Sequence, residues 1–177
     1  LSIQFSLDGF SFCVLDSKTQ KDIYFAQYQF EETLNSLEDL LKRIETIFKN
    51  DANLQIEYAA VSVIHQSNLS TIVPSKYFDK KSLANYLNFN IKTLKTDFIT
   101  FDNINTIDAK NVYVPYVNIN NYLFQNFGEF EYQHHSSILL EKLLKIESST
   151  EKKMYVNVSK SSFDIVVLEN RKLIFSN

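Results

Sequence analysis

The chain has 177 residues, with 45% apolar and 14% aromatic residues, a formal net charge of −3 and a pI of about 5.6. This length fits one domain with an insertion, or one domain and part of a second, and the apolar fraction is sufficient for a core. The acidic balance and the absence of a lysine or arginine stripe argue against nucleic-acid binding, and no apolar run approaches the length of a membrane span, so we expect neither nucleic-acid binding nor direct membrane insertion.

The first thirty residues predict three strands, at Ser2–Ser6, Phe10–Asp16 and Asp22–Tyr28. Asp8-Gly9 is predicted to form the first turn, because this dipeptide accepts the positive φ that a tight hairpin requires. The middle strand is apolar on both faces, which predicts burial on both sides. It contains Cys13, the single cysteine of the chain, which excludes an intramolecular disulfide and fits a reducing compartment, so we expect a cytoplasmic protein.

A helix is predicted from about Glu31 to Lys49, where apolar residues recur at three- and four-residue steps, and a strand is predicted at Ile56–Ile64. Residues from about Ser67 to Ile107 are predicted to form a small inserted unit. Its elements are a strand at Ser70–Pro74, a short helix capped by Asp79 and ending near Asn88, and an extended segment at Asp97–Asp102.

Four elements are predicted after the insertion. They are a strand at Asn111–Tyr116, a helix at Ile119–Phe127 closed by Gly128, a strand at Glu129–His134, and a helix capped by Ser136 or Ser137. A polar stretch at Glu147–Lys153 leads to the last strands. The alternation of strands and helices favours an α/β protein with a mixed sheet flanked by helices.

Similar segments occur at the two ends of the chain. LSIQFSLDGFSFCVLD (Leu1–Asp16) and MYVNVSKSSFDIVVLE (Met154–Glu169) share a serine, a phenylalanine, a valine and a leucine at a constant offset. The later segment RKLIFSN likewise matches KDIYFAQ (Lys21–Gln27). Unrelated segments of this length share roughly one identity, so the pairing indicates a duplicated α/β domain whose halves each begin with a hairpin.

With the run NVYVPYVNINNYLFQNFGEFEYQHHSSILLEKLL between these ends, the chain resembles the actin-like ATPase superfamily, in its pilus-assembly and cell-division branch. It also resembles an uncharacterised Bacteroidetes family known only as a domain of unknown function. The resemblance implies a ribonuclease-H-like, actin-like ATPase fold. A first domain would occupy 1–150, with an insertion at about 67–107, and 151–177 would begin an incomplete second domain of a longer protein.

In active members of that superfamily each hairpin turn carries an Asp-x-Gly pattern, whose glycines let backbone N–H groups approach phosphate oxygens. By resemblance these positions fall on Ser6 and Asp8 in the first copy and on Ser159 and Ser161 in the second. Both acids and both glycines are therefore replaced, and Gly9 and Gly128 are the only glycines in the chain. A shift of the first alignment by two residues gives Asp8 an acidic role but breaks the match between the copies.

Other catalytic and metal-binding patterns are weakly represented. His134-His135, with His65 as a third ligand, is a poor metal site because adjacent residues of a strand point to opposite faces. No Gly-x-Ser-x-Gly elbow is present, and the strand around Cys13 favours neither exposure nor a positive neighbour. Acids of the first helix resemble those of ribonuclease-H-like nucleases, but the first strand carries Ser6 where that chemistry needs an acid. We expect no metal and no cofactor.

We expect a catalytically inactive actin-like domain that binds another protein of unknown identity. By resemblance to the pilus-assembly proteins, the insertion at 67–107 is the predicted contact region. The aromatic residues between Tyr113 and Tyr132 are interpreted mainly as core, and alternatively as a peptide-binding groove. Two further readings stay open, namely an ATP-binding enzyme or switch whose C-terminal half supplies the nucleotide contacts, and a purely structural subunit.

Overall fold

The computed structural model describes residues 1–19 and 21–177, which form two compact units. The first unit consists of Leu1–Gln66 and Tyr116–Gln133, and the second of Ser67–Pro115 and His134–Asn177. The chain therefore passes between the units more than once, and each unit is built from segments that are distant in the sequence.

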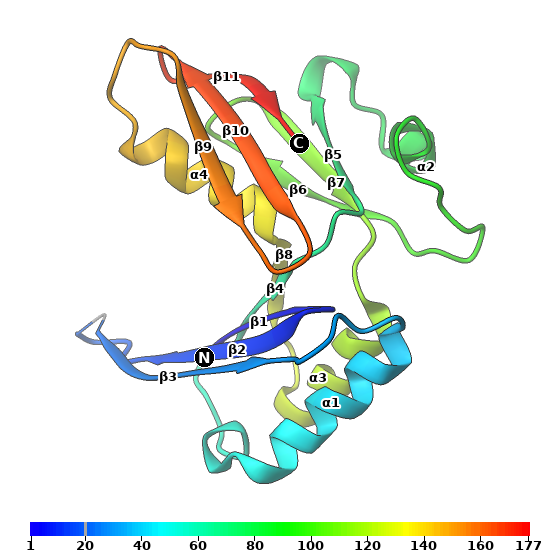
Figure 1. Ribbon diagram of the computed structural model, residues 1–177, viewed down its shortest axis with the longest axis vertical. Helices are drawn as coiled ribbons and strands as arrows, with labels where there is room; N and C mark the ends of the chain where they lie inside the picture. The colour runs from blue at the N-terminus through cyan, green and yellow to red at the C-terminus, as the bar shows by residue number, and fades with distance from the viewer. Residues whose placement is uncertain (20) are drawn as a thin grey trace. The chain divides into compact units, whose positions relative to one another are not determined.

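The first unit contains a five-stranded mixed sheet of order β3-β2-β1-β4-β8. The first three strands form an antiparallel meander, and β1 pairs with β4 in parallel. Two helices pack against one face of this sheet (Figure 1). The bounds are β1 Ser2–Ser6, β2 Gly9–Leu15, β3 Asp22–Gln29, β4 Ser62–His65, β8 Glu131–His134, α1 Leu37–Asn50 and α3 Val117–Phe127.

The core of the first unit lies between the sheet and these helices. Phe10 and Phe12 on β2 are each only 1% exposed, and the Phe10 ring lies 6.0 Å from that of Phe48 on α1. Leu15, on the opposite face of β2, is 41% exposed. The prediction that β2 is buried on both sides is therefore wrong, because α1 and α3 both cover the same face.

Helix α1 begins at Leu37, later than the predicted start at Glu31. Ser36 is its N-cap, and the Ser36 hydroxyl oxygen accepts a hydrogen bond from the Asp39 N–H. The residues before this cap lie along the β1–β2 hairpin and are not part of the helix, since the Leu34 N–H donates a hydrogen bond to the Leu7 carbonyl. Strand β4 is also shorter than predicted, because only Ser62–His65 pairs with the five-residue strand β1.

The second unit contains two three-stranded antiparallel sheets with orders β5-β7-β6 and β11-β10-β9. Helix α2 packs with the first of these sheets, and α4 packs between β6 and β10 (Figure 1). The bounds are β5 Ser70–Pro74, α2 Leu83–Asn88, β6 Thr100–Ile104, β7 Ala109–Tyr113, α4 His135–Ile146, β9 Lys153–Val158, β10 Phe163–Glu169 and β11 Lys172–Ser176.

Several boundaries in the second unit differ from the predicted ones: β6 covers Thr100–Ile104 where Asp97–Asp102 was predicted, and β7 covers Ala109–Tyr113 where Asn111–Tyr116 was predicted. Strand β7 is the central strand between β5 and β6, so the sheet of the insertion extends past Ile107. Helix α4 begins at His135 and is capped by His134, whose Nδ1 accepts the Ser136 N–H, so neither Ser136 nor Ser137 is the cap. The predictions that a strand ends at His134 and that Gly128 closes α3 are confirmed.

The two meanders, β1-β2-β3 and β9-β10-β11, repeat in structure as they do in sequence. At one constant offset in residue number, the cross-strand pair Phe5–Phe10 corresponds to Val158–Phe163, and the pair Ile3–Phe12 corresponds to Val156–Ile165. The register irregularity in the middle strand also recurs, between Val14 and Leu15 in β2 and between Val167 and Leu168 in β10. Matching register and a matching irregularity support the duplication inferred from the sequence.

The third strands align one residue away from the match predicted by sequence. Val14 pairs with Tyr24, and the equivalent Val167 pairs with Phe175, whereas the sequence match equates Tyr24 with Ile174. The connections before these strands differ in form, since Asn170 and Arg171 both adopt positive φ in a two-residue hairpin turn.

Candidate functional site

The first candidate turn lies in the first unit, between β1 and β2. Its two turn residues are Leu7 and Asp8, because Ser6 pairs with Gly9. The Asp8 N–H donates to the Ser6 Oγ at 3.1 Å, and the Asp8 Oδ1 accepts the Thr33 hydroxyl at 2.6 Å. A phosphate-binding turn directs its backbone N–H groups outward to the ligand. Here the N–H and the carboxylate of Asp8 instead hold the hairpin and the segment after β3 together.

Gly9 has a different role from the predicted one. It is the first residue of β2 and does not adopt positive φ, which among glycines occurs at Gly128. A Cβ added at Gly9 would lie 2.8 Å from the carbonyl oxygen of Tyr28 on β3. Glycine is therefore required by the close approach of two backbones, and the prediction of a left-handed turn residue is wrong.

The second candidate turn lies in the second unit, between β9 and β10. It is a four-residue loop from Ser159 to Ser162, closed by a hydrogen bond of 2.8 Å from the Ser159 N–H to the Ser162 carbonyl. Ser161 is exposed in this loop. Four residues separate Val158 from Phe163, as four separate Phe5 from Phe10, so the two connections have the same length and differ in the residues that form them.

Asp164, just after this loop, forms hydrogen bonds through both carboxylate oxygens, and it was not predicted from the sequence as a site residue. Its Oδ1 lies 3.0 Å from the Nε2 of His135, and its Oδ2 accepts the Asn157 amide at 2.9 Å. Burial raises the pKa of Asp164, but the hydrogen bonds from His135 and Asn157 outweigh burial and hold the pKa below its usual value. The position of this acid inside the apolar run FDIVVLE is the sequence feature that could have identified it. The pair joins α4 to β10.

A buried polar cluster centred on Asp102 of β6 was also not predicted. The Asp102 Oδ2 accepts the His134 N–H at 2.8 Å and the Ser137 hydroxyl at 2.6 Å, and its Oδ1 accepts the Tyr113 hydroxyl at 3.0 Å. Burial raises the pKa of Asp102, and the three hydrogen bonds oppose that rise. Asn111 donates to the Ser137 Oγ, while its own Oδ1 is buried and accepts no bond among the described residues.

This cluster contains serine, histidine and aspartate but does not have the geometry of a hydrolase. The Ser137 hydroxyl donates to Asp102 and not to a histidine, whereas a nucleophilic serine gives its proton to an imidazole. The His134 Nδ1 accepts the Ser136 N–H, so its Nε2 carries the proton toward Ser67 Oγ at 3.3 Å. An imidazole in this tautomer cannot take a proton from Ser67. The cluster fixes the start of α4 to β6.

His65, the third histidine considered above as a metal ligand, lies in the core of the first unit. Its Nδ1 accepts the Tyr116 N–H at 3.1 Å, and its Nε2 donates to the Asn120 Oδ1 at 2.9 Å. Burial lowers the pKa of His65 to about 4, so the ring is neutral at physiological pH. Both ring nitrogens are occupied. Across residues 1–19 and 21–177 no group of three or more His, Cys, Asp or Glu could hold a metal ion.

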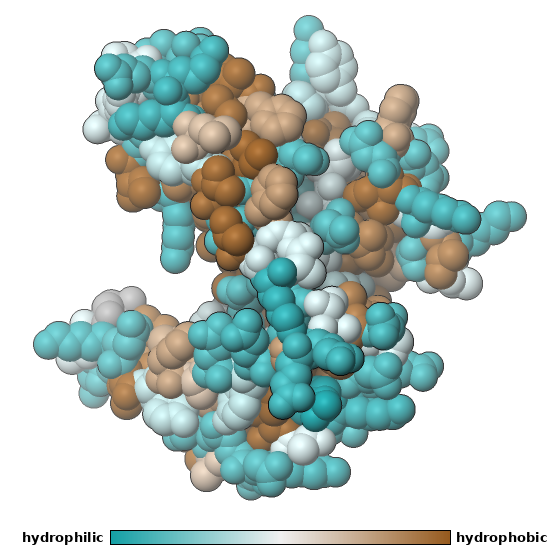
Figure 2. All heavy atoms as spheres, viewed as in Figure 1, coloured by the Kyte–Doolittle hydropathy of each residue, from teal (hydrophilic) through white to brown (hydrophobic). Residues whose placement is uncertain are grey.

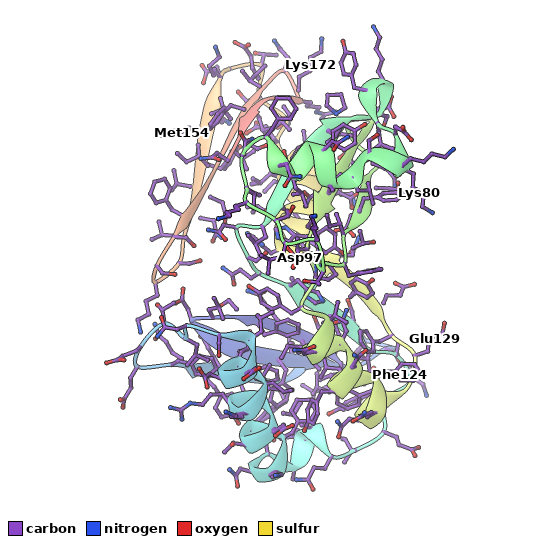
Figure 3. All side chains as sticks on the ribbon, turned by 90° about the vertical axis from the view of Figure 1, so that its right-hand side faces the viewer. Lys80, Asp97, Phe124, Glu129, Met154 and Lys172 are labelled. Atoms are coloured by element: carbon purple, nitrogen blue, oxygen red, sulfur yellow. The ribbon has the colours of Figure 1, made fainter. Side chains whose placement is uncertain are left out.

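Cys13 and most aromatic residues between Tyr113 and Tyr132 lie in surroundings that fit a role in the fold and not in a reaction. The Cys13 Sγ lies 3.5 Å from an oxygen of Asp22, and burial together with this acid raises the thiol pKa, which disfavours the thiolate. Most aromatic residues between Tyr113 and Tyr132 belong to or pack against the cores, as predicted, whereas Phe124 on α3 points outward (Figure 3). No helix in the described part of the chain has both the length and the apolar character needed to cross a membrane.

The family described as "Protein of unknown function (DUF3822)" matches residues 1–177. Among solved structures, a Bacteroides thetaiotaomicron protein with actin-like ATPase fold and unknown function aligns with a TM-score of 0.89 and 21% identity, covering 100% of this chain and 68% of that one. The fold of this chain is therefore that of the actin-like ATPases, as the sequence resemblance implied.

Two further structures align over 99% of this chain. A chain of the PilM-PilN type IV pilus biogenesis complex has a TM-score of 0.57 and 10% identity, with 59% of its length covered. The cytoplasmic domain of EpsL, an inner membrane component of the type II secretion system of Vibrio cholerae, has a TM-score of 0.45 and 12% identity, with 68% covered. No curated protein matches the sequence.

Proposed function

Because the chain belongs to the family described as "Protein of unknown function (DUF3822)" and has the actin-like ATPase fold, we propose that it is a catalytically inactive actin-like domain that acts as a protein-interaction module. In this proposal the first domain occupies 1–150, with its insertion at 67–107, and 151–177 begins the second domain. The fold supplies the framework for contacts with a protein partner and performs no hydrolysis.

The bonding of the first hairpin turn carries this proposal. The Asp8 N–H is donated to Ser6, and the Asp8 carboxylate accepts the Thr33 hydroxyl. A triphosphate placed at this turn would meet a carboxylate of like charge and would gain no glycine-lined approach to the backbone. In the second turn Ser159 and Ser161 occupy the positions of the acid and the glycine. Neither turn offers the chemistry that holds a nucleotide with its metal ion.

The partner is proposed to contact the insertion. Its surface exposes large apolar side chains, with Phe89 88% and Leu94 65% exposed, close in sequence to Lys92 and Lys95. Aromatic and aliphatic anchors of this kind are typical of protein contacts. One relative of this fold is a chain of a PilM-PilN complex, which is consistent with a protein partner for the present chain.

Affinity capture with two matched variants tests the interaction. Phe89→Ser combined with Leu94→Ser removes both exposed anchors, and Phe124→Ser removes an exposed aromatic residue of α3. We expect the double variant to lose a specifically captured protein that the intact chain and the Phe124→Ser variant both retain. If the double variant recovers every partner of the intact protein, the proposed contact region is wrong.

The alternative is an ATP-binding enzyme or switch, and the preserved register of the two meanders favours it. In that case the nucleotide contacts would come from the C-terminal half. Phosphate release distinguishes the two functions. An ATP-binding enzyme requires phosphate release by the wild-type protein, whereas the proposal requires none.

A further inference from the structure

The insertion carries a net charge opposite in sign to that of the whole chain. Residues 67–107 contain five lysines and three aspartates and no other charged side chain, whereas the 177 residues together have a net charge of −3. All five lysines are exposed, and they are Lys76, Lys80, Lys81, Lys92 and Lys95. Exposed charges of one sign attract a partner of the opposite sign. The insertion is therefore a basic surface on an acidic protein.

The three aspartates of the insertion are bound to groups other than the lysine ammonium groups. Asp79 accepts the Lys81 backbone N–H at 2.9 Å, and Asp97 accepts the Leu94 N–H at 2.8 Å. Asp102 lies in the buried cluster described above. Within residues 1–19 and 21–177, none of the five lysines forms an ion pair with a carboxylate. Their ammonium groups are available to a partner.

Two of these lysines lie in a loop that also exposes large apolar side chains. The loop consists of residues 89–98, between α2 and β6, and is here called the insertion loop. Phe89 is 88% exposed, Leu94 65% and Phe98 55%, and Lys92 and Lys95 alternate with them along the sequence. Figure 1 shows the insertion loop projecting from the second unit beyond α2, and Figure 2 shows apolar next to strongly hydrophilic side chains in this region. The loop thus presents apolar and cationic groups together.

The backbone of the insertion loop is fixed by hydrogen bonds and packing. The Thr93 hydroxyl donates to the Asn88 amide oxygen at 2.6 Å, and the Asp97 N–H donates to the Leu94 carbonyl at 3.1 Å. The Asp97 carboxylate in turn accepts the Leu94 N–H. Ile91 packs against the core of the insertion. A loop that is already ordered loses less conformational entropy when a partner binds.

We propose that the insertion loop binds an acidic segment of the protein partner, an inference that rests on the proposed function of the insertion. Carboxylates of this segment pair with Lys92 and Lys95, and its apolar side chains cover Phe89, Leu94 and Phe98. The apolar contacts supply most of the affinity. The ion pairs select an acidic segment over a basic one and accelerate its association.

An anionic membrane surface would attract the same lysines, but the loop fits a protein segment better. A fluid bilayer offers no fixed spacing of charges, so it gains nothing from the hydrogen bonds that order the loop. Helices that lie in a bilayer interface carry lysine or arginine on their polar face. The six residues of α2, LANYLN, contain neither. We therefore assign the loop to a protein segment and include vesicles in the test.

Selection from a random peptide library tests the proposal, with the full-length protein as bait. Counter-selection against Phe89→Ser combined with Leu94→Ser removes peptides that bind elsewhere. We expect the remaining peptides to be enriched in Asp and Glu. Lys92→Glu combined with Lys95→Glu should raise their Kd about tenfold. Peptides remade with Lys in place of each acid should bind this charge-reversed variant more tightly than they bind the wild-type protein.

Lys142→Glu combined with Lys145→Glu is the matched control. These exposed lysines of α4 have the same spacing as Lys92 and Lys95, and the change in net charge is the same. The control should change the Kd of the selected peptides by less than about twofold, because separated surface charges are screened by salt. If the charge-reversed variant does not fold, Lys92→Gln with Lys95→Gln replaces it, with an expected increase in Kd of about threefold.

Three results would overturn the proposal, and they separate it from the proposed function. Selected peptides that depend on Phe89 and Leu94 but bind the charge-reversed variant as tightly as the wild-type protein leave the contact region in place and refute the acidic segment. A library that yields no peptide dependent on Phe89 and Leu94 refutes the contact region as well. Vesicles of anionic phosphatidylglycerol that bind the wild-type protein and neither loop variant assign the loop to a membrane surface instead.

Discussion

His65 shows how one buried side chain can set the pH response of the first unit. Its two ring nitrogens are used in opposite senses, one accepting the Tyr116 N–H and the other donating to Asn120. Only the neutral ring satisfies both bonds. The ring also lies 4.8 Å from that of Phe5 in an edge-on arrangement, so a charge on it would be surrounded by apolar groups.

We predict that this histidine makes the protein less stable in mild acid. The unfolded chain binds the proton near pH 6.5, whereas burial holds the pKa of folded His65 at about 4. Between these values the unfolded state binds more protons, so stability falls as the pH falls. The expected loss between pH 7 and pH 5 is about 2 kcal/mol, measured by urea unfolding. In His65→Gln the loss over this range should be smaller by that amount, and an equal loss in both proteins would contradict the assignment.

Gly9 is the second residue with a specific geometric role. A methyl group at this position meets the Tyr28 carbonyl at 2.8 Å, and that oxygen belongs to the backbone of β3. We predict that Gly9→Ala destabilises the protein by about 1–3 kcal/mol in urea unfolding. Ser11→Ala, two residues along the same strand, should change stability by less than about 0.5 kcal/mol. A Gly9→Ala variant as stable as Ser11→Ala would show that β2 and β3 separate easily at this point.

At the scale of elements, the Asp102 cluster joins β6, β7 and the start of α4. Its members come from three separate segments of the sequence, and no local spacing connects them. The donors are a backbone N–H, a serine hydroxyl and a tyrosine hydroxyl. Each would remain buried and unsatisfied if the carboxylate were lost, and this makes the cluster costly to disrupt.

We predict that Asp102→Asn destabilises the protein by about 1–3 kcal/mol, because an amide places N–H groups against donors. The exposed neighbour Asn103, replaced by alanine, is the control and should cost less than about 0.5 kcal/mol. Hydrogen exchange at the first turn of α4 should be faster in Asp102→Asn and unchanged in the control. Unaltered exchange would mean that the helix start is held by other contacts.

Local patterns predicted the elements of this protein better than their contacts. The meanders, the helix closed by Gly128 and the helix after His134 follow from periodicity and turn chemistry. The start of α1 did not, because the Leu34 N–H is bound by the carbonyl of Leu7, far away in the sequence. The Asp102 cluster and the His135–Asp164 pair depend on tertiary contacts that spacing does not encode. The burial of β2 on one face depends equally on which helices follow it.

At the scale of the whole molecule, the two meanders of the actin-like fold have matching strand registers, and we propose that their turns do not bind phosphate. In each unit the turn is closed by its own hydrogen bonds, through Ser6 and Asp8 in one and through Ser159 and Ser162 in the other. The proposed interaction module needs the strand register and does not need phosphate-binding turns. The affinity of the protein for a nucleotide distinguishes such a module from an ATPase.

Isothermal titration of the complete protein with Mg·ATP measures that affinity directly. We predict no saturable heat at ATP concentrations up to the millimolar range, because the Asp8 and Ser159 N–H groups are bonded within their own turns and the Asp8 carboxylate repels a triphosphate. A matched titration of the Asp8→Gly variant should remain equally silent, since Ser6, Ser159 and Ser161 are still in place. Saturable micromolar binding to the wild-type protein, accompanied by phosphate release, would contradict the account.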